Sequence, residues 1–224
     1  MGAEARGSAA PQPPRTLSAR RYASQGPCYR RAMNAPGRLA ETVAPYRFTY
    51  DDVLRMVETG ILADDARVEL IEGELIAVSP ESVPHVRCRR WLTQFFTRRL
   101  AEGQWEINSD APIRLDDQTA PEPDLAIFPS TVHDRDLKGG DIMLAIEVSV
   151  SSQAFDLGKK ADLYAAAGVR EYWVVDVSGQ RLIVHREPTA GGYRSIWEEG
   201  VRGGVAPKAF PHLEIRVGDL PLTD

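Results

Sequence analysis

The sequence predicts a mixed α/β domain in which a central β-sheet has helices on both faces. Three observations support this fold class. The segment 142–177 has the pattern strand, helix, strand, which requires a right-handed crossover between parallel strands. The connections that precede it are hairpin-like, which implies antiparallel strands. The strand at 142–148 is apolar on both faces, as is typical of a central strand covered on both sides.

The first expected elements are a helix and a hairpin. Thr49 or Asp51 can cap a short helix at about 50–58, which Gly60 ends. Alternating runs at 68–71 and 75–78 flank Glu72-Gly73-Glu74, so we predict a β-hairpin that turns at Gly73.

The next helix opens at Pro84 and runs to about Leu100. Its buried stripe has the spacing i, i+3, i+4, i+7 and consists of Cys88, Trp91, Leu92 and Phe95. Arg87, Arg90, Gln94 and Arg98 lie on another face, which we interpret as a solvated surface with nucleic-acid contact as the alternative.

The second half of the domain alternates strands with one helix. Strands are expected at 105–108, 113–115, 124–128, 142–148, 172–177 and 181–185, with two weaker ones at 194–197 and 213–217. The charged, glycine-containing loop at 129–141 is expected to be exposed and mobile. A helix that starts at Ser152 or Asp156 ends at Gly168, a natural residue for a helix C-terminus.

Composition and charge set further bounds. The 224 residues are 43% hydrophobic and 26% charged, as in a soluble globular protein, and no apolar run approaches the ~18 residues of a membrane span. Cys28 and Cys88 lie in unlike contexts, so we expect no disulfide and a reducing cytoplasm. Residues 1–40 hold seven Arg and one Glu, a net +6, so residues 41–224 carry −11 of the chain's net −5. Such an acidic body is not the usual footprint of a nucleic-acid binder.

Residues 1–45 form a basic tail that we predict to be disordered, because it has few bulky aliphatic side chains to bury. It has the composition of an organelle transit peptide or of a basic arm that contacts phosphates. The third interpretation is that the natural chain starts at Met33 and residues 1–32 are not translated. The folded domain is expected to span residues 46–220.

Glu147 stands in the apolar strand at 142–148, near its C-terminal end. Burying an ionised carboxylate without a partner costs several kcal/mol, so this side chain needs a cation, strong hydrogen bonds or a proton. Asp124 stands at the start of another strand, after two prolines that keep the approach extended. If the two strands are neighbours, the two carboxylates lie side by side, which suits Mg²⁺ with its preference for one or two carboxylates plus waters.

Lys160 is the candidate cation. Leu157, Lys160, Ala161 and Tyr164 share one helical face, which directs Lys160 toward the sheet and leaves Lys159 on the flank. Asp, Glu, metal and Lys together can hydrolyse a phosphodiester. The competing interpretation is a structural cluster of ion pairs, or a Glu147 that meets water at the sheet edge.

The residues above resemble those of the Uma-two family of predicted restriction endonucleases, a branch of the PD-(D/E)XK nuclease superfamily. The similar stretches are RVELIEGELIAVSPESVPH, PEPDLAIFP and IEVSVSSQAFDLGKKADLYAAAGVREYWVVD, within residues 47–217. The resemblance implies a restriction endonuclease-like core, DNA as substrate, and Mg²⁺ or Mn²⁺ held by Asp124 and Glu147. It also implies catalytic roles for Lys160, Glu69 and His85, with a hairpin ion pair and a helix-start hydrogen bond as the structural alternatives for Glu69 and His85.

The chain departs from the superfamily pattern at two positions. Ser149 stands where the usual lysine follows the glutamate, and in the Uma-two pattern the lysine has moved to the next helix, at Lys160. Val150 stands where relatives often have an acidic residue. These departures keep a second function open, a nuclease-fold module that binds nucleic acid or protein with little or no cleavage. A serine hydrolase is not indicated, because no GxSxG motif is present. A homodimer is expected by analogy with nucleases that cut both strands.

Overall fold

The computed structural model describes residues 44–133 and 136–223. The predicted disorder of residues 1–43 lies outside the described residues, and the boundary at residue 46 stays a prediction. The longest helices of the described residues are α1 (Tyr50–Glu58) and α2 (Val83–Thr97). A helical segment after the fifth strand is divided into α3 (Gln153–Phe155), a π-helical turn η3 (Asp156–Lys160) and α4 (Ala161–Ala166).

The central sheet has six strands in the order β3-β4-β5-β6-β7-β8. Their bounds are β3 (Trp105–Asn108), β4 (Leu125–Pro129), β5 (Leu144–Ser149), β6 (Glu171–Asp176), β7 (Arg181–Thr189) and β8 (Gly192–Gly200). Only β5 and β6 pair in parallel, and every other neighbouring pair is antiparallel. The predicted mixed sheet with one crossover is therefore confirmed.

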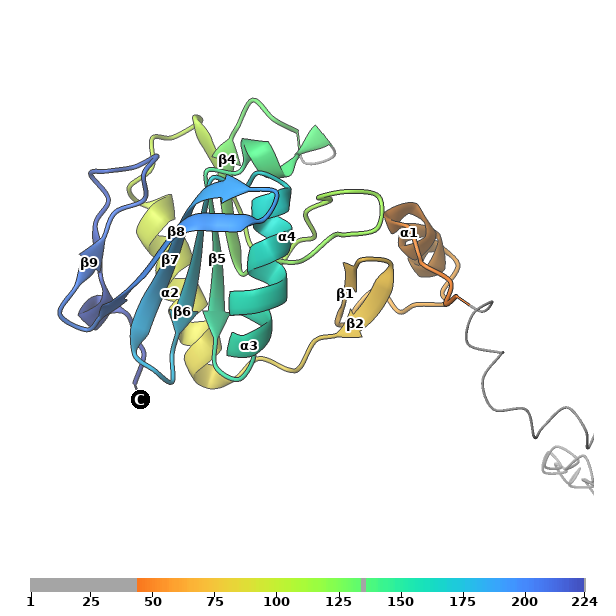
Figure 1. The fold of residues 1–224 in the computed structure, drawn as a ribbon, viewed down its shortest axis with the longest axis horizontal. Helices are drawn as coiled ribbons and strands as arrows, with labels where there is room; N and C mark the ends of the chain where they lie inside the picture. The colour runs from red at the N-terminus through yellow and green to blue at the C-terminus, as the bar shows by residue number, and fades with distance from the viewer. Residues whose placement is uncertain (1–43, 134–135, 224) are drawn as a thin grey trace, which may run out of the picture. The chain divides into compact units, whose positions relative to one another are not determined.

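The sheet separates two apolar clusters, with α2 on one face and α3 to α4 on the other (Figure 1). On the α2 face, Leu144, Ile146 and Val148 of β5 pack with α2 and the C-terminal segment. On the α4 face, Ala145 packs with Tyr164 of α4. All six residues of β5 are buried, as expected of a central strand.

The hairpin joins β1 (Val68–Ile71) to β2 (Glu74–Ala77). Glu72 and Gly73 both have positive φ, 49° and 78°, which is the backbone of a type I′ turn. A Cβ on Gly73 would lie 2.6 Å from Cβ of Arg47, so the position also needs glycine for space. The turn that the sequence predicts at Gly73 is confirmed.

Helix α1 begins at a capping box. The Thr49 side chain accepts a hydrogen bond from the Asp52 amide at 3.1 Å, and Asp52 Oδ2 accepts from the Thr49 amide at 3.0 Å. The same carboxylate accepts from the hydroxyl of Tyr46, so the segment before the helix is fixed to its first turn. Of the two predicted caps, Thr49 is the one used.

Short elements complete the described chain. They are η2 (Gly139–Asp141), β9 (Gly204–Val205), β10 (Ile215–Arg216) and η4 (Val217–Asp219). β9 and β10 pair with each other rather than with the main sheet. The predicted strands at 194–197 and 213–217 therefore differ from the structure in length, because β8 is longer and β10 has only two residues.

The strand predicted at 113–115 is wrong. This segment has no strand structure, although Ile113 and Leu115 donate backbone hydrogen bonds to Pro121 and Thr119 across a tight loop. Pro112 and Pro121 cannot donate to a ladder, so the two sides of the loop do not form a regular pair. Asp110 at φ 52° redirects the chain just before.

The prediction of an exposed loop at 129–141 is partly wrong. Leu137 and Gly139 are buried. A Cβ on Gly139 would lie only 2.4 Å from the carbonyl oxygen of Ala167, so this part of the loop packs directly against the end of α4. The charged composition of the segment conceals the buried apolar side chain of Leu137, and Val132 packs against the same cluster.

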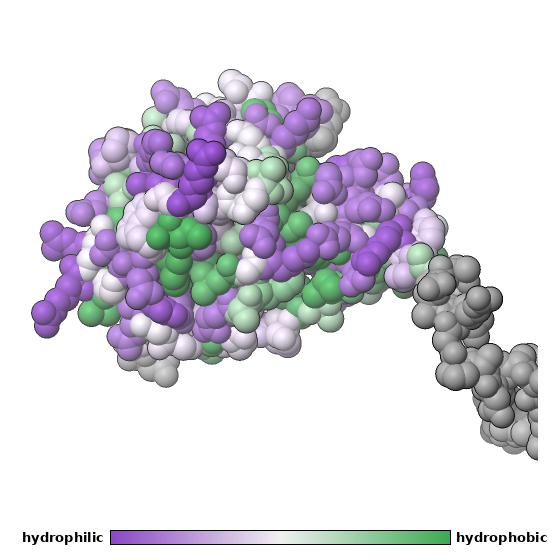
Figure 2. Space-filling model, viewed as in Figure 1, coloured by the Kyte–Doolittle hydropathy of each residue, from purple (hydrophilic) through white to green (hydrophobic). Residues whose placement is uncertain are grey.

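Within residues 44–133 and 136–223, no helix is long and apolar enough to cross a membrane. In the view of Figure 1, hydrophilic side chains cover most of the surface, and an apolar patch lies where β8 runs (Figure 2).

Candidate metal-binding active site

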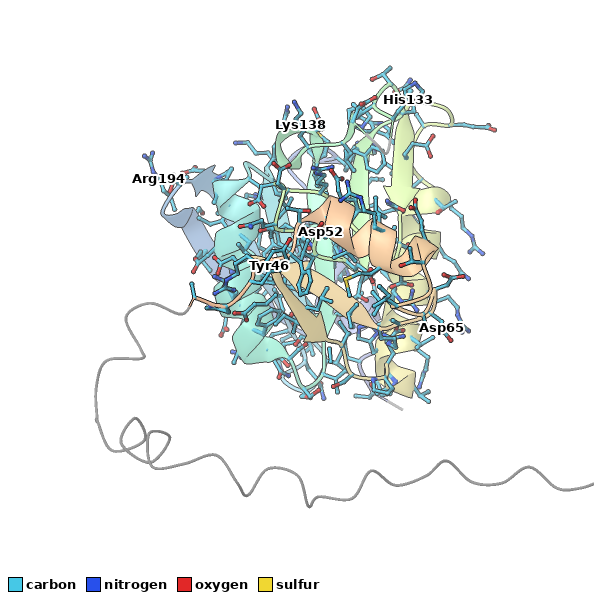
Figure 3. The ribbon with its side chains drawn as sticks, turned by 90° about the vertical axis from the view of Figure 1, so that its right-hand side faces the viewer. Tyr46, Asp52, Asp65, His133, Lys138 and Arg194 are labelled. Atoms are coloured by element: carbon cyan, nitrogen blue, oxygen red, sulfur yellow. The ribbon has the colours of Figure 1, made fainter. Side chains whose placement is uncertain are left out.

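A cleft of about 800 Å³ opens where the hairpin, the start of α2 and the C-terminal end of β5 meet. All five residues singled out from the sequence line it: Glu69, His85, Asp124, Glu147 and Lys160. They come from segments far apart in the chain, so the fold itself assembles the group. The hairpin and α1 lie on the side that faces the viewer in Figure 3, where Asp65, another residue of the cleft, is labelled at the edge.

Asp124 lies directly before β4, and its carboxylate takes the place of a strand partner. The backbone amide of Val148 in β5 donates to Asp124 Oδ2 at 2.6 Å. Because Leu125 pairs with Ile146 in the antiparallel ladder, Asp124 falls opposite Glu147. His85 Nε2, from the first turn of α2, lies 3.1 Å from the same oxygen. Asp124 is thus fixed by the sheet and by α2 together.

Glu147 and Glu69 share Lys160 between them. Lys160 Nζ lies 3.0 Å from Oε1 of each glutamate. Tyr164, one turn further along the helix, donates its hydroxyl to Glu147 Oε1 at 3.1 Å. The exposed fraction of Glu69, Glu147 and Lys160 is 5% each, so these ion pairs form away from bulk water. Lys160 fulfils the prediction that it points toward the sheet.

The segment that carries Lys160 is π-helical rather than α-helical. Such turns are rare and often occur at functional sites. Lys159, its neighbour, lies on the flank, where Nζ reaches Glu72 Oε1 at 2.5 Å. Two consecutive lysines therefore bind two glutamates of the hairpin, one pair buried and one at the surface.

Burial and crowding of negative charge raise the pKa of two of these carboxyl groups. The pKa of Glu147 lies well above its usual range because the side chain is buried, and Asp124, Asp156 and Glu69 add to the effect although Lys160 opposes it. Burial likewise raises the pKa of Glu69. Burial alone would lower the pKa of Lys160, but Glu147, Glu69 and Asp156 outweigh it and raise that pKa. The lysine therefore stays charged at neutral pH.

The charge balance of the cleft fits a bound divalent cation. Four buried carboxylates, Glu69, Asp124, Glu147 and Asp156, face one buried lysine among the described residues that line the cleft. Adding a cation would lower the raised pKa of Glu147 and relieve this repulsion. Within the described residues, no three His, Cys, Asp or Glu side chains gather closely enough to hold a metal by themselves. Mg²⁺ suits such a sparse oxygen set, since it keeps several waters of its own.

The sequence patterns miss a second group at the mouth of the cleft. Arg89 of α2 pairs with Glu81 at 2.8 Å and with Asp110, and its Nε lies 4.0 Å from Asp124 Oδ1. His85 Nδ1 lies 3.5 Å from the same Glu81. The available signal is the spacing of His85 and Arg89, four residues apart on one face of α2. Two members of this group, His85 and Arg89, lie beside the carboxylate of Asp124.

Ser149 occupies the strand position where the resemblance expects a lysine. Its hydroxyl lies 3.1 Å from that of Ser152, which donates to Asp156 Oδ2 at 2.5 Å. The chain of hydroxyl groups therefore ends on a buried carboxylate, and the lysine that reaches Glu147 comes from the helix segment instead, at Lys160. Val150 also lines the cleft.

Comparison with known proteins agrees with this geometry. A family model described as "Putative restriction endonuclease", Uma2, matches residues 50–218. This chain belongs to the Uma2 family. No curated protein matches. The solved structures that match include a crystal structure described as a putative nuclease belonging to DUF820 from Anabaena variabilis ATCC 29413, with a TM-score of 0.64 at 16% identity. The match covers 79% of this Uma2 chain and 99% of that chain, so the two share a fold.

Proposed function

We propose that this Uma2 protein is a metal-dependent endonuclease that hydrolyses phosphodiester bonds of DNA. The observation that carries the proposal is the position of Lys160, whose Nζ lies 3.0 Å from Glu147 Oε1 in a cleft that also holds Asp124. Membership of a family described as "Putative restriction endonuclease" supports it, as does the shared fold with a protein described as a "putative nuclease".

Lys160 acts in this proposal as a fixed positive charge. Its raised pKa keeps the ammonium protonated, so it cannot serve as a general base at neutral pH. It can donate hydrogen bonds to a phosphate oxygen and stabilise negative charge that develops there. Tyr164 and Glu69 keep the Lys160–Glu147 pair oriented.

Asp124 and Glu147 would hold Mg²⁺ or Mn²⁺. A bound divalent ion supplies a nucleophilic water at neutral pH and neutralises charge on the phosphoryl group. The residues of the chain fix the two carboxylates: the amide of Val148 and His85 hold Asp124, while Tyr164 and Lys160 hold Glu147.

A second candidate function is a nuclease-fold module that binds without cutting. The observation that favours it is the charge of the cleft, where nine Asp or Glu residues line the walls against only two Lys or Arg residues. Such a cleft repels a polyanion until cations are bound. The absence of metal binding would favour this second function, and metal binding without DNA cleavage would leave the site real but its substrate unassigned.

The test is calorimetric titration of Mn²⁺ and Mg²⁺, with plasmid nicking measured on the same samples. We expect Asp124→Asn and Glu147→Gln to lose metal binding and to reduce nicking by about a hundredfold or more. Lys160→Met should keep metal binding and lose nicking. The isosteric substitutions leave the shapes of the side chains intact, so thermal unfolding can verify that each variant is folded.

The matched control is Asp65→Asn, which removes an exposed carboxylate from the rim of the same cleft. It should bind metal and nick DNA as the unmodified protein does. Metal binding that survives in both Asp124→Asn and Glu147→Gln would overturn the site. Nicking that survives in all three active-site variants would reveal a contaminating nuclease.

Two further parts of the proposal concern the setting of the protein. We infer a reducing, cytoplasmic setting, since the two cysteines, Cys28 and Cys88, lie in unlike sequence contexts and Cys88 is a free thiol. We also propose that the protein works as a homodimer, because a single active site reaches only one strand of a duplex at a time.

A further inference from the structure

The strand β8 ends the sheet, and nothing described in the chain pairs with its outer edge. It is nine residues long, from Gly192 to Gly200. Such an edge presents unpaired amide and carbonyl groups that can accept another strand. Proteins protect long edges with charges, bulges or a partner. The side chains and backbone groups that β8 presents therefore show which kind of protection this edge has.

The backbone groups that face outward can be derived from the sheet register. The Val177 amide donates to Ser149 O, so odd-numbered residues of β6 face β5 and even-numbered residues face β7. Asp176 pairs with Arg181, which directs odd-numbered residues of β7 to β6 and even-numbered ones to β8.

In the ladder between β7 and β8, Leu182 pairs with Glu199 and Val184 pairs with Trp197. The odd-numbered residues of β8 therefore face β7, and the even-numbered residues from 194 to 198 direct their amide and carbonyl groups outward. The Gly203 amide, which donates to Gly200 O at 2.8 Å, agrees with this assignment, because that carbonyl also faces away from β7.

The residues whose amide and carbonyl groups face outward are Arg194, Ile196 and Glu198, and their side chains are exposed. Ile196 is 57% exposed, although it is a large aliphatic side chain in the middle of a strand. Figure 2 shows an apolar patch in this region between hydrophilic neighbours, and in Figure 3 the side chain of Arg194 points away from the body of the domain. Glu198 lies two residues beyond Ile196, as Arg194 lies two residues before it.

We propose that β8 is a dimerisation edge whose partner is the β8 strand of a second copy of this chain. In an antiparallel pair centred on Ile196, each Arg194 lies opposite Glu198 of the other copy, and the two Ile196 side chains meet. The arrangement is self-complementary, as a two-fold interface requires. The backbone supports it, since the same three residues direct their amide and carbonyl groups outward.

The pairing joins the two six-stranded sheets into one continuous sheet. Two opposite-charge pairs form across it, and each also adjoins Arg181, which already contacts Glu198 at 2.8 Å within its own chain. Charge thus selects this register over a slip by two residues, in which Arg194 would face Ile196. The inference depends on the fold and the surface of β8 and not on the proposed nuclease activity.

The test is sedimentation velocity across a range of protein concentrations, with a charge-swap pair of variants. Arg194→Glu places two carboxylates opposite each other in the dimer, and Glu198→Arg places two guanidinium groups opposite each other. We expect each variant alone to dimerise roughly tenfold more weakly or worse. A mixture of the two variants should form a heterodimer, because each chain then faces the opposite charge of its partner.

Ile196→Asp should abolish the dimer, and Ile61→Asp is its matched control. Ile61 is 74% exposed and lies outside the sheet, just after α1, so its substitution should leave dimerisation unchanged. Thermal unfolding shows whether each variant is folded. A monomeric unmodified protein at every concentration would overturn the proposal, and so would a mixture of the charge variants that fails to associate.

Discussion

The buried carboxylate of Glu147 costs free energy of folding when it is ionised. Glu147 is buried, its pKa is raised by that burial, and neighbouring acids strengthen the effect. Lys160 compensates, but it is shared with Glu69. A raised pKa in an acid means that the folded state holds the proton more tightly than the unfolded state. The contribution to stability is therefore complete below the unfolded value of 4.5 and is lost as pH rises through the folded pKa.

Glu147→Gln should consequently not destabilise the metal-free protein at neutral pH. The amide keeps the oxygen that accepts from Lys160 and Tyr164 but removes the buried charge. In EDTA, we expect the Tm of the variant to match or exceed that of the unmodified protein, with a difference that grows from pH 5 to pH 9. Lys160 does not change charge in this window, because its pKa is raised above 10.5. Differential scanning calorimetry in EDTA and then in Mn²⁺ is the measurement.

A lower Tm of Glu147→Gln in EDTA would mean that the carboxylate stabilises the fold through its ion pair. That result would contradict the direction of the pKa and favour a purely structural cluster. Tyr164→Phe is a suitable control, since it removes one hydrogen bond to Glu147 and leaves the charge in place.

The proximity of Asp124, Glu147 and Lys160 can be predicted from the sequence, because strand alternation and one helical face determine where those side chains point. The surroundings cannot be predicted in this way. Arg89 contacts Asp124 through geometry that depends on how α2 crosses the sheet, and Asp110 reaches Arg89 from an irregular loop. The backbone amide of Val148 donates a hydrogen bond to Asp124, and no pattern of side chains in the sequence predicts such a contact.

At the scale of elements, the loop before β5 contributes more than its composition indicates. Gly139 lies against the carbonyl of Ala167 at the end of α4, and Gly140 beside it has open space. The loop thus fixes the C-terminal end of the helix segment that carries Lys160. The sequence predicts the strands and helices well because their periodicity is strong, and it predicts this loop poorly because one buried Leu137 stands among charged residues.

Gly139→Ala should therefore be destabilising and Gly140→Ala close to neutral. The new methyl group at 139 would lie 2.4 Å from Ala167 O, so the backbone must shift. We expect a loss of about 1–3 kcal/mol, which corresponds to a fall in Tm of roughly 2–4 °C per kcal/mol for a domain of this size. Chemical denaturation of the two variants side by side measures the difference, and equal stabilities would contradict the close packing.

The π-helical turn η3 shows why helical periodicity gives only part of the answer. The sequence pattern assumes 3.6 residues per turn, whereas the extra residue in a π turn changes the phase of every side chain that follows. Lys160 is the last residue of η3 and still points inward, because Ala161 and Tyr164 pack on the sheet beyond it. The prediction of the inward face holds, and the local geometry that achieves it could not be predicted.

For the whole molecule, the distribution of charge provides a test of whether the N-terminal segment is a basic arm that contacts phosphates. Residues 1–40 carry +6 and residues 41–224 carry −11. If the basic segment contacts phosphates, its removal weakens DNA binding and reduces the slope of log affinity against log salt concentration.

Deletion of residues 1–40 should leave the Tm unchanged, because the capping box at Thr49 and every described helix and strand lie beyond it. Fluorescence anisotropy with labelled duplex, at several salt concentrations and in Ca²⁺, measures the binding slope. A shallower slope in the shortened chain indicates the basic arm, and identical slopes exclude phosphate contacts by this segment. A fall in Tm would contradict the expected independence of the domain.

The hydrogen bond from the Val148 amide to Asp124 affects the order in which candidate active-site residues can be lost during evolution. Replacing Asp124 by an apolar residue removes the partner of a buried amide, so it damages folding as well as chemistry. Replacing Lys160 leaves the backbone ladder intact, and the two glutamates that it neutralises, Glu69 and Glu147, have raised pKa values and can each take up a proton in its absence. A descendant that abandons cleavage would therefore retain the aspartate for architectural reasons and lose the lysine first. In a distant homologue, an aspartate at this position indicates little about activity, and the presence or absence of the helical lysine is the informative character.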